Sequence, residues 1–219
     1  MFLWGSLAIA VLFLGGAAAI ASRVPRYRSE AAQFNAQMTA AERATRDSVL
    51  AQRGKRTQLA MAILQRDIRI RSLQQKKVHL AVVLEDSVLE LRHGRATLRR
   101  AKLQIGPDAA VRAPDGRTWR VVRPVGERRV ADLQRNPVYT VPEWVYVHQG
   151  MPIPPETERR VAGGLGSYVI RLDDGTEIHT EPQVGPLKGR VKPAAFQARA
   201  RDMGAIFDAV KEETPVYIY

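Results

Sequence analysis

The stretch Leu165–Thr180, LGSYVIRLDDGTEIHT, carries most of the information about the fold. Ser167–Leu172 is a short run rich in β-branched and aromatic residues, which predicts a strand. Asp174-Gly175 is a turn dipeptide. The pattern therefore predicts a strand and a tight turn, followed by a segment that carries a histidine, His179.

The rest of residues 106–219 has a similar sequence pattern. Short β-branched and aromatic runs, interrupted by glycine, proline and aspartate, predict further strands, whereas residues 200–211 predict one helix with a single apolar face. Together they predict an α+β fold whose C-terminal domain, residues 106–219, is mostly antiparallel β. The predicted strands are 117–122, 139–141, 144–147, 167–172 and 215–219.

The preceding segment has a different composition. Residues 30–102 contain no proline and only two glycines, Gly54 and Gly94, and are rich in good helix formers. Apolar residues recur at coiled-coil spacing, so a basic helical stalk is predicted over residues 23–105. A break at either glycine would fold it into a hairpin, and a binding helix for another protein is a further alternative. The predicted packing residues are Leu59, Ile63, Ile70, Leu73, Leu80, Leu84, Leu91 and Leu98.

The N-terminal segment is apolar. Phe2–Ala21 is a run of 20 residues without a charged side chain, about the length that crosses a hydrocarbon core. Residues 1–22 are predicted to be a transmembrane anchor, and a cleaved signal peptide is the alternative because Ala19-Ile20-Ala21 has the spacing of a processing site. The predicted anchor residues include Phe2, Trp4, Leu12, Phe13, Gly15 and Gly16.

Charge is distributed unevenly along the chain. The 219 residues carry a net charge of +12, yet residues 106–219 hold 16 Lys+Arg against 15 Asp+Glu. The excess lies in the predicted anchor and stalk, which favours the lipid bilayer and other subunits of a membrane complex as partners and argues against nucleic acid. The chain has no cysteine, and its histidines lack metal-ligand spacing. No metal and no cofactor are therefore predicted.

Three blocks within residues 115–219 together resemble the catalytic domain of the L,D-transpeptidases, which cross-link peptidoglycan stem peptides through a cysteine acyl-enzyme. The first block is Asn136-Pro137 with Trp144 and Pro154-Pro155, and the second is Leu165–Thr180, similar to the family's LG-x-Y strand, DG turn and I-H-G motif. The third is the helix from Asp202 to Val210 with the strand Thr214–Ile218. The resemblance implies a cell-wall function.

The chain departs from the family at the nucleophile. Counting back seven residues from Asp202 places Ala195 where the family has its cysteine, and Pro193 stands in the same segment. Neither side chain can attack a carbonyl or accept a proton. Of the family's polar centre only His179 is present, and Thr180 replaces the following glycine; Ser167 or Thr180 as a substitute nucleophile is a minor alternative. The sequence thus predicts a pseudoenzyme with a vestigial cleft at His179, Trp144, Tyr146 and Ala195.

These observations predict a catalytically inactive, membrane-anchored structural or scaffold subunit of a bacterial membrane complex. The resemblance implies the inner membrane with a periplasmic body, although Arg23, Arg26 and Arg28, which follow the anchor, favour a cytoplasmic one. Two alternatives stay open. One is a non-catalytic peptidoglycan-binding module, and the other is a cell-wall transpeptidase with displaced chemistry.

Overall fold

The computed structural model describes residues 29, 32–33 and 35–219, in two compact units, Met1–Ala60 and Met61–Tyr219. The predicted membrane anchor, residues 1–22 with Phe2, Trp4, Leu12, Phe13, Gly15 and Gly16, lies outside the described residues. Within the described ranges, no helix is both long enough and apolar enough to cross a bilayer.

A long helix occupies part of the predicted stalk. Helix α2 (Ala40–Gln74) begins with a capping box, in which Thr39 Oγ1 accepts a hydrogen bond from Glu42 N (3.3 Å) and Glu42 Oε2 accepts one from Thr39 N (2.8 Å). The helix continues through Gly54, so the chain does not break there. Three of the predicted packing residues are exposed and one is half-buried: Leu59, Ile63, Ile70 and Leu73.

The prediction that the stalk helix extends to residue 105 is wrong. Residues 78–105 form three strands, β1 (Val78–Val83), β2 (Val88–His93) and β3 (Ala96–Ile105), joined by tight turns. Apolar residues within a strand recur at every second position, as in Leu80 and Val82 or Leu89 and Leu91, whereas the seven-residue spacing joins residues of different elements. Gly94 (φ 61°) provides the β2–β3 turn. The predicted stalk residues that lie in or beside these strands are Leu80, Leu84, Leu91 and Leu98. The β domain therefore begins near Val78 rather than at residue 106.

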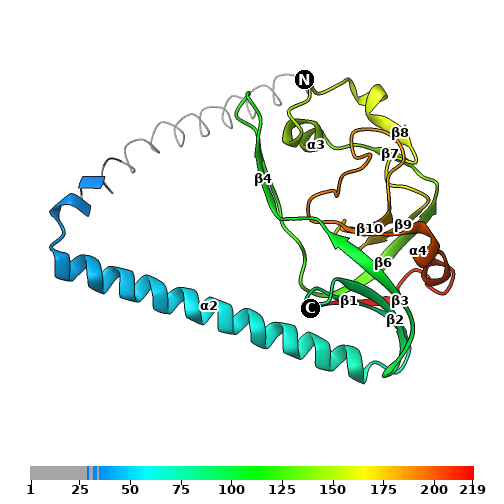
Figure 1. The fold of residues 1–219 in the computed structure, drawn as a ribbon, viewed down its shortest axis with the longest axis horizontal. Helices are drawn as coiled ribbons and strands as arrows, with labels where there is room; N and C mark the ends of the chain where they lie inside the picture. The colour runs from blue at the N-terminus through cyan, green and yellow to red at the C-terminus, as the bar shows by residue number, and fades with distance from the viewer. Residues whose placement is uncertain (1–28, 30–31, 34) are drawn as a thin grey trace, which may run out of the picture. The chain divides into compact units, whose positions relative to one another are not determined.

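These strands join five others in a closed barrel (Figure 1). The order around it is β1-β12-β6-β9-β10-β11-β3-β2. The β1–β12 and β10–β11 pairs are parallel and the other pairs of the barrel are antiparallel, so the predicted mostly antiparallel domain is confirmed. The additional strands are β6 (Gly126–Arg135), β9 (Tyr168–Leu172), β10 (Glu177–Thr180), β11 (Phe196–Ala198) and β12 (Pro215–Ile218).

Alternate residues of the barrel strands form the main core. Helix α4 (Ala200–Phe207) packs one apolar face on this core, through Met203, Ile206 and Phe207. The predicted helix is thus confirmed over most of its length. The strand residues in this core include Leu80, Val82, Leu89, Leu91, Val130, Ile170, Ile178, Phe196, Ala198 and Val216.

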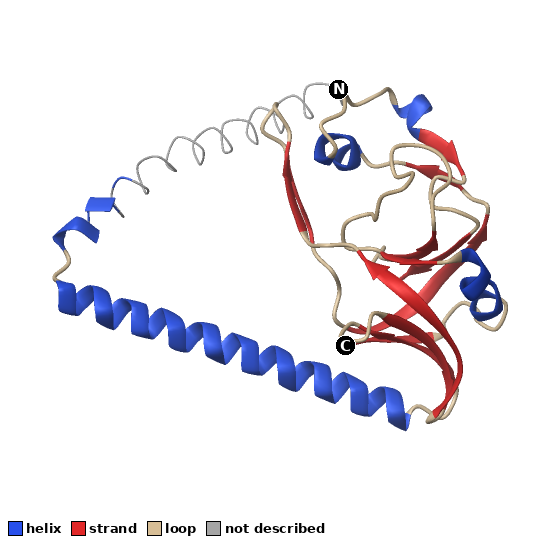
Figure 2. Ribbon diagram, viewed as in Figure 1, coloured by secondary structure: helices blue, strands red, loops and turns tan. Residues whose placement is uncertain are grey.

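Several short strands and helices lie outside the barrel sheet (Figure 2). Strands β4 (Ala109–Arg112) and β5 (Thr118–Val121) form one hairpin, and β7 (Val138–Thr140) pairs with β8 (Arg160–Ala162) beside a short 3₁₀ helix, Glu156–Arg159. Residues 144–147 were predicted to be a strand, and this is wrong. They belong to helix α3 (Glu143–His148), whose Val145 and Tyr146 pack into a second buried cluster, so tertiary contact overrides the strand propensity of its valines.

The C-terminal end of α2 packs on the outer face of β1 and β12, within the Met61–Tyr219 unit. Ile68 joins Ala81 and Tyr217 in a small apolar cluster. His79 lies at its edge, fully buried, with its ring edge-on to that of Tyr217 at 5.5 Å between centroids. Ser72 Oγ lies 3.2 Å from His79 Nε2, so the helix is attached to the barrel by polar as well as apolar contacts.

Candidate functional site

The residues that the sequence singles out meet on the outer face of β10 and β11. Ile178, Phe196 and Ala198 face the barrel core. Because strand side chains alternate, their neighbours point outward, and the parallel register pairs His179 with Gln197. Ala195, directly before β11, lies on the same outward side as Gln197. Ala195 and His179 therefore lie on the same side of these neighbouring segments.

A second, smaller core covers this face. It combines residues of the β7–α3 insertion with Leu165, Val169 of β9 and Leu187. Val169 pairs with His179 in the β9–β10 ladder, so the insertion lies over the strands that carry the site. Tyr146 is part of this core and is buried, which makes it a packing residue rather than a wall of an open cleft.

A buried ion pair occupies the centre of the site. Lys192 Nζ bonds Glu177 Oε2, and each residue is only 7% exposed. The same ammonium lies 5.4 Å from the ring centroid of Tyr139 and 5.8 Å from that of Trp144. Two charges are tolerated here because each neutralises the other and the aromatic faces also favour the cation. The sequence analysis did not single out Lys192, Glu177 or Tyr139.

Tyr139 contributes a buried phenol. Its side-chain oxygen finds no hydrogen-bond partner among the described residues. Burial raises the pKa of the Tyr139 hydroxyl, and the nearby Glu177 carboxylate raises it further. Tyr139 therefore stays protonated and offers an unused donor at the wall of the site.

His179 is fully buried beneath this pair. Its Nδ1 lies 2.8 Å from the carbonyl oxygen of Thr180, and since a carbonyl only accepts, Nδ1 carries the proton. Nε2 makes no direct hydrogen bond in the described part of the chain, although the nearby backbone of Leu165 favours the protonated ring. Burial lowers the pKa of His179 to about 4, and the positive charge of Lys192 lowers it further against the opposing Thr180 hydrogen bond. The imidazole is neutral at pH 7.

The segment that carries Ala195 is held by the end of β3. Gly106 N donates to Ala195 O (2.9 Å), and Ala194 N donates to Pro107 O (3.1 Å). A Cβ on Gly106 would lie 1.9 Å from Lys192 O, so only glycine allows this approach. Ala194 has φ 54°, in the left-handed region. The backbone keeps a tight turn, although the side chain at Ala195 is a methyl.

Thr180 is used structurally. Its Oγ1 accepts hydrogen bonds from Ser167 N (2.7 Å) and Tyr168 N (3.1 Å), and the residue is 1% exposed. A hydroxyl with both lone pairs engaged and no access to solvent is a poor nucleophile. The arrangement therefore gives no support to Thr180 as a substitute for the missing cysteine.

An open pocket of about 470 Å³ adjoins the ion pair. Tyr139 and Trp144 form aromatic walls, Lys192 and Glu177 lie at its polar end, and Arg120 of β5 lines it from another side. Trp144 is thus the predicted cleft residue that lines the pocket, whereas His179, Tyr146 and Ala195 do not. No group of histidine, aspartate and glutamate side chains in the described residues could hold a metal ion.

The solved structures to which the chain is similar are L,D-transpeptidases. One, from Xylanimonas cellulosilytica, matches at 14% identity over 66% of this chain and 61% of that one, with a TM-score of 0.47. A mutant L,D-transpeptidase from Enterococcus faecium matches at 16% identity over 66% of this chain and 50% of that one, with a TM-score of 0.45. L,D-transpeptidase 1 of Mycobacterium tuberculosis matches at 14% identity over 65% of this chain and 61% of that one, with a TM-score of 0.42.

The chain therefore spans about half to three fifths of the length of these structures. No protein-family profile matches the chain, and no curated protein matches it by sequence. The family of the structural neighbours is the family whose motifs the sequence resembles.

Proposed function

We propose that this chain is a catalytically inactive cell-wall protein that binds peptidoglycan stem peptides in the pocket beside Trp144 without cutting them. One observation carries the proposal. The position of the nucleophile holds the methyl of Ala195, while the adjacent pocket keeps aromatic walls and charged groups that suit a peptide. Its volume of about 470 Å³ lies in the range of small-ligand sites.

Sedimentation of the full chain with purified sacculi tests this function. Wild type is expected to pellet with the sacculi, and Trp144→Ala to pellet less, because the substitution removes one aromatic wall. Trp119→Ala is the matched control, since Trp119 lies on β5, stacks with Arg117 at 5.3 Å and does not line the pocket. Wild type that pellets no more than a soluble protein would contradict the proposal, and so would equal losses in both variants.

A structural role in a membrane complex is the second candidate, and the apolar surface of α2 favours it. Leu59, Ile63 and Ile70 are 62%, 59% and 51% exposed, which is unusual for large aliphatic side chains on one helix. Their spacing of four and seven residues places them on one side of α2. This side is available to a helix of another subunit, as the coiled-coil interpretation proposes.

Purification in a mild detergent, followed by mass spectrometry, tests the structural role. A stoichiometric partner is expected with wild type and with Trp144→Ala, and it should be lost from Ile63→Gln/Ile70→Gln. Recovery of the chain alone contradicts this candidate. The proposed inner-membrane anchor and periplasmic body are tested by protease accessibility in spheroplasts, where a protected domain would overturn them.

A further inference from the structure

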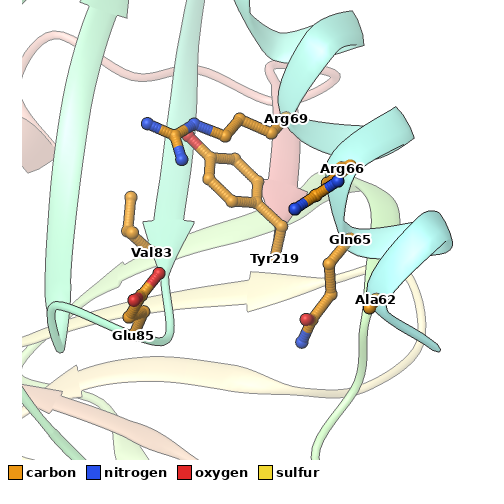
Figure 3. A pocket seen from close by; sticks show the side chains of 7 residues that line it. All are labelled: Ala62, Gln65, Arg66, Arg69, Val83, Glu85 and Tyr219. Atoms are coloured by element: carbon orange, nitrogen blue, oxygen red, sulfur yellow. The ribbon is translucent and has the colours of Figure 1, made fainter. Parts of the chain in front are cut away.

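A separate pocket of about 270 Å³ lies where the end of α2 meets the barrel, entirely within the Met61–Tyr219 unit. Figure 3 shows the side chains of Gln65, Arg66 and Arg69 extending from the helix around the ring of Tyr219, with Val83 and Glu85 on the facing side. This pocket is formed by different elements from the Trp144 pocket and contains none of its residues.

The helix wall of the pocket presents hydrogen-bond donors. Gln65, Arg66 and Arg69 lie on one face of α2, because residues three and four apart are neighbours on a helix. Two guanidinium groups and one amide therefore project to the same side. Guanidinium groups bind phosphate and carboxylate oxygens through two parallel N–H bonds, so this wall suits an oxyanion.

Both arginines are uncompensated within the described residues. Neither Arg66 nor Arg69 makes an ion pair there, although Arg71, two residues further along the same helix, pairs with Asp67 at 2.9 Å. The C-terminal end of α2 thus contains one arginine with a partner of its own, Arg71, and two that line a concave surface without one. This difference provides an internal control.

Tyr219 supplies an independent observation. The residue is 7% exposed and lines the pocket, yet its hydroxyl has no hydrogen-bond partner among the described residues. Figure 3 places this hydroxyl beside the guanidinium of Arg69. An orphaned buried hydroxyl normally has a water or ligand partner, and an oxyanion that bridges Arg69 and Tyr219 satisfies both groups at once.

Glu85 restricts the charge of the ligand. It is the one acidic side chain that lines the pocket, and it is exposed. A carboxylate at this position repels a doubly charged anion more than a singly charged one. The remaining lining, Ala62, Val83 and the Tyr219 ring, is apolar and suits an organic substituent next to the anionic group.

We propose that this pocket binds a singly charged phosphate group, with Arg66 and Arg69 as the main ligands and Tyr219 and Gln65 as additional donors. A phosphodiester, as in a phospholipid headgroup, and the H2PO4⁻ form of free inorganic phosphate both present a singly charged phosphate group. The proposal is independent of the function assigned to the Trp144 pocket.

Isothermal titration calorimetry on the full chain in a neutral maltoside detergent, at constant ionic strength, tests the site. The two probes are glycerophosphoglycerol, a soluble phosphodiester headgroup, and inorganic phosphate. Binding of the diester alone assigns the site to a headgroup, and binding of inorganic phosphate alone assigns it to the free ion. Absence of binding by both probes overturns the proposal.

Variants that should weaken or strengthen binding of the probes make this test more specific. Arg66→Gln and Arg69→Gln should each weaken binding about tenfold, because each removes a charge-assisted contact. Tyr219→Phe should weaken it about threefold through loss of a neutral donor. Glu85→Gln should tighten it, since it removes the repelling charge. Arg71→Gln, the control, should bind as wild type does. Equal effects of Arg69→Gln and Arg71→Gln would show general charge attraction and overturn the proposal.

Discussion

Two buried histidines lie on outer faces of the same barrel, His79 on β1 and His179 on β10, separated by three strands in either direction. His79 has a partner on each ring nitrogen: Lys77 O lies 3.0 Å from Nδ1 and Ser72 Oγ lies 3.2 Å from Nε2. His179 has a partner on Nδ1 only.

The two histidines thus differ in whether both ring nitrogens are hydrogen-bonded. Buried polar groups are nearly always hydrogen-bonded, so a fully partnered histidine is explained by the packing of α2 on the barrel. The bare nitrogen of His179 has no such explanation within the described chain.

The largest effect is expected at the ion pair above His179. Lys192→Ala should lower the free energy of unfolding by about 3–5 kcal/mol, because it leaves the Glu177 carboxylate buried without a partner. Urea denaturation followed by circular dichroism measures this. Arg71→Ala removes an exposed pair with Asp67 and should cost no more than about 1 kcal/mol. Similar costs for the two variants would show that the site is not sealed from water.

The pH dependence of stability gives the next largest effect. The unfolded chain binds a proton on His179 near its ordinary pKa of 6.5, whereas the folded protein does so only near its lowered pKa of about 4. The unfolded state therefore binds more protons between these values, and stability falls as pH drops from 6.5 to 4, by about 3 kcal/mol from this residue.

Denaturation curves at pH 7 and pH 4.5 measure this loss. His179→Leu should reduce it markedly. Part of the loss should persist in the variant, since burial also lowers the pKa of His79. A stability of wild type that does not change with pH in this range would contradict the burial of His179.

A direct comparison of the two histidines should give a difference of about 1–2 kcal/mol in the free energy of unfolding. His79→Leu leaves the buried Ser72 hydroxyl without its partner and is the costlier change. His179→Leu sacrifices one hydrogen bond and at the same time removes the unpartnered Nε2. Thermal unfolding of both variants at pH 7 tests the order, and a reversed order would remove the distinction drawn between them.

The smallest effect is expected at Ala194. An L-residue in the left-handed region is strained, so Ala194→Gly should relieve about 1 kcal/mol, partly offset by the greater freedom of glycine in the unfolded chain. A net gain of about 0.5 kcal/mol is expected by chemical denaturation. A loss of stability would mean that the methyl of Ala194 makes packing contacts worth more than the strain.

Several secondary-structure elements of this molecule could be predicted from local sequence patterns. The strand at 167–172, the turn at Asp174-Gly175 and the helix from residue 200 follow from alternation, turn chemistry and one apolar face, which depend on neighbouring residues alone. The assignment of Ala195 to one site with His179 came from the spacing of family motifs. In the structure His179 lies in β10 and pairs with Gln197, and Ala195 directly precedes β11.

Other parts depend on contacts that one sequence does not display. Residues 78–105 satisfy both a seven-residue and a two-residue apolar period, and the barrel selects the second by burying Leu80, Leu89 and Leu103. The Lys192–Glu177 pair cannot be predicted from the sequence unless one knows that the segment before β11 lies beside β10. A lysine followed by proline in a loop gives no signal of burial.

The parallel ladder between β1 and β12, in which Leu80 pairs with Val216, also governs how the chain acquires its structure. The first barrel strand is synthesised long before its partner, so the barrel cannot close until β12 has been made. Until then β1 and β6, the two neighbours of β12, each keep an open edge that another chain can join. A chaperone that shields these edges during synthesis would therefore raise the yield of folded protein.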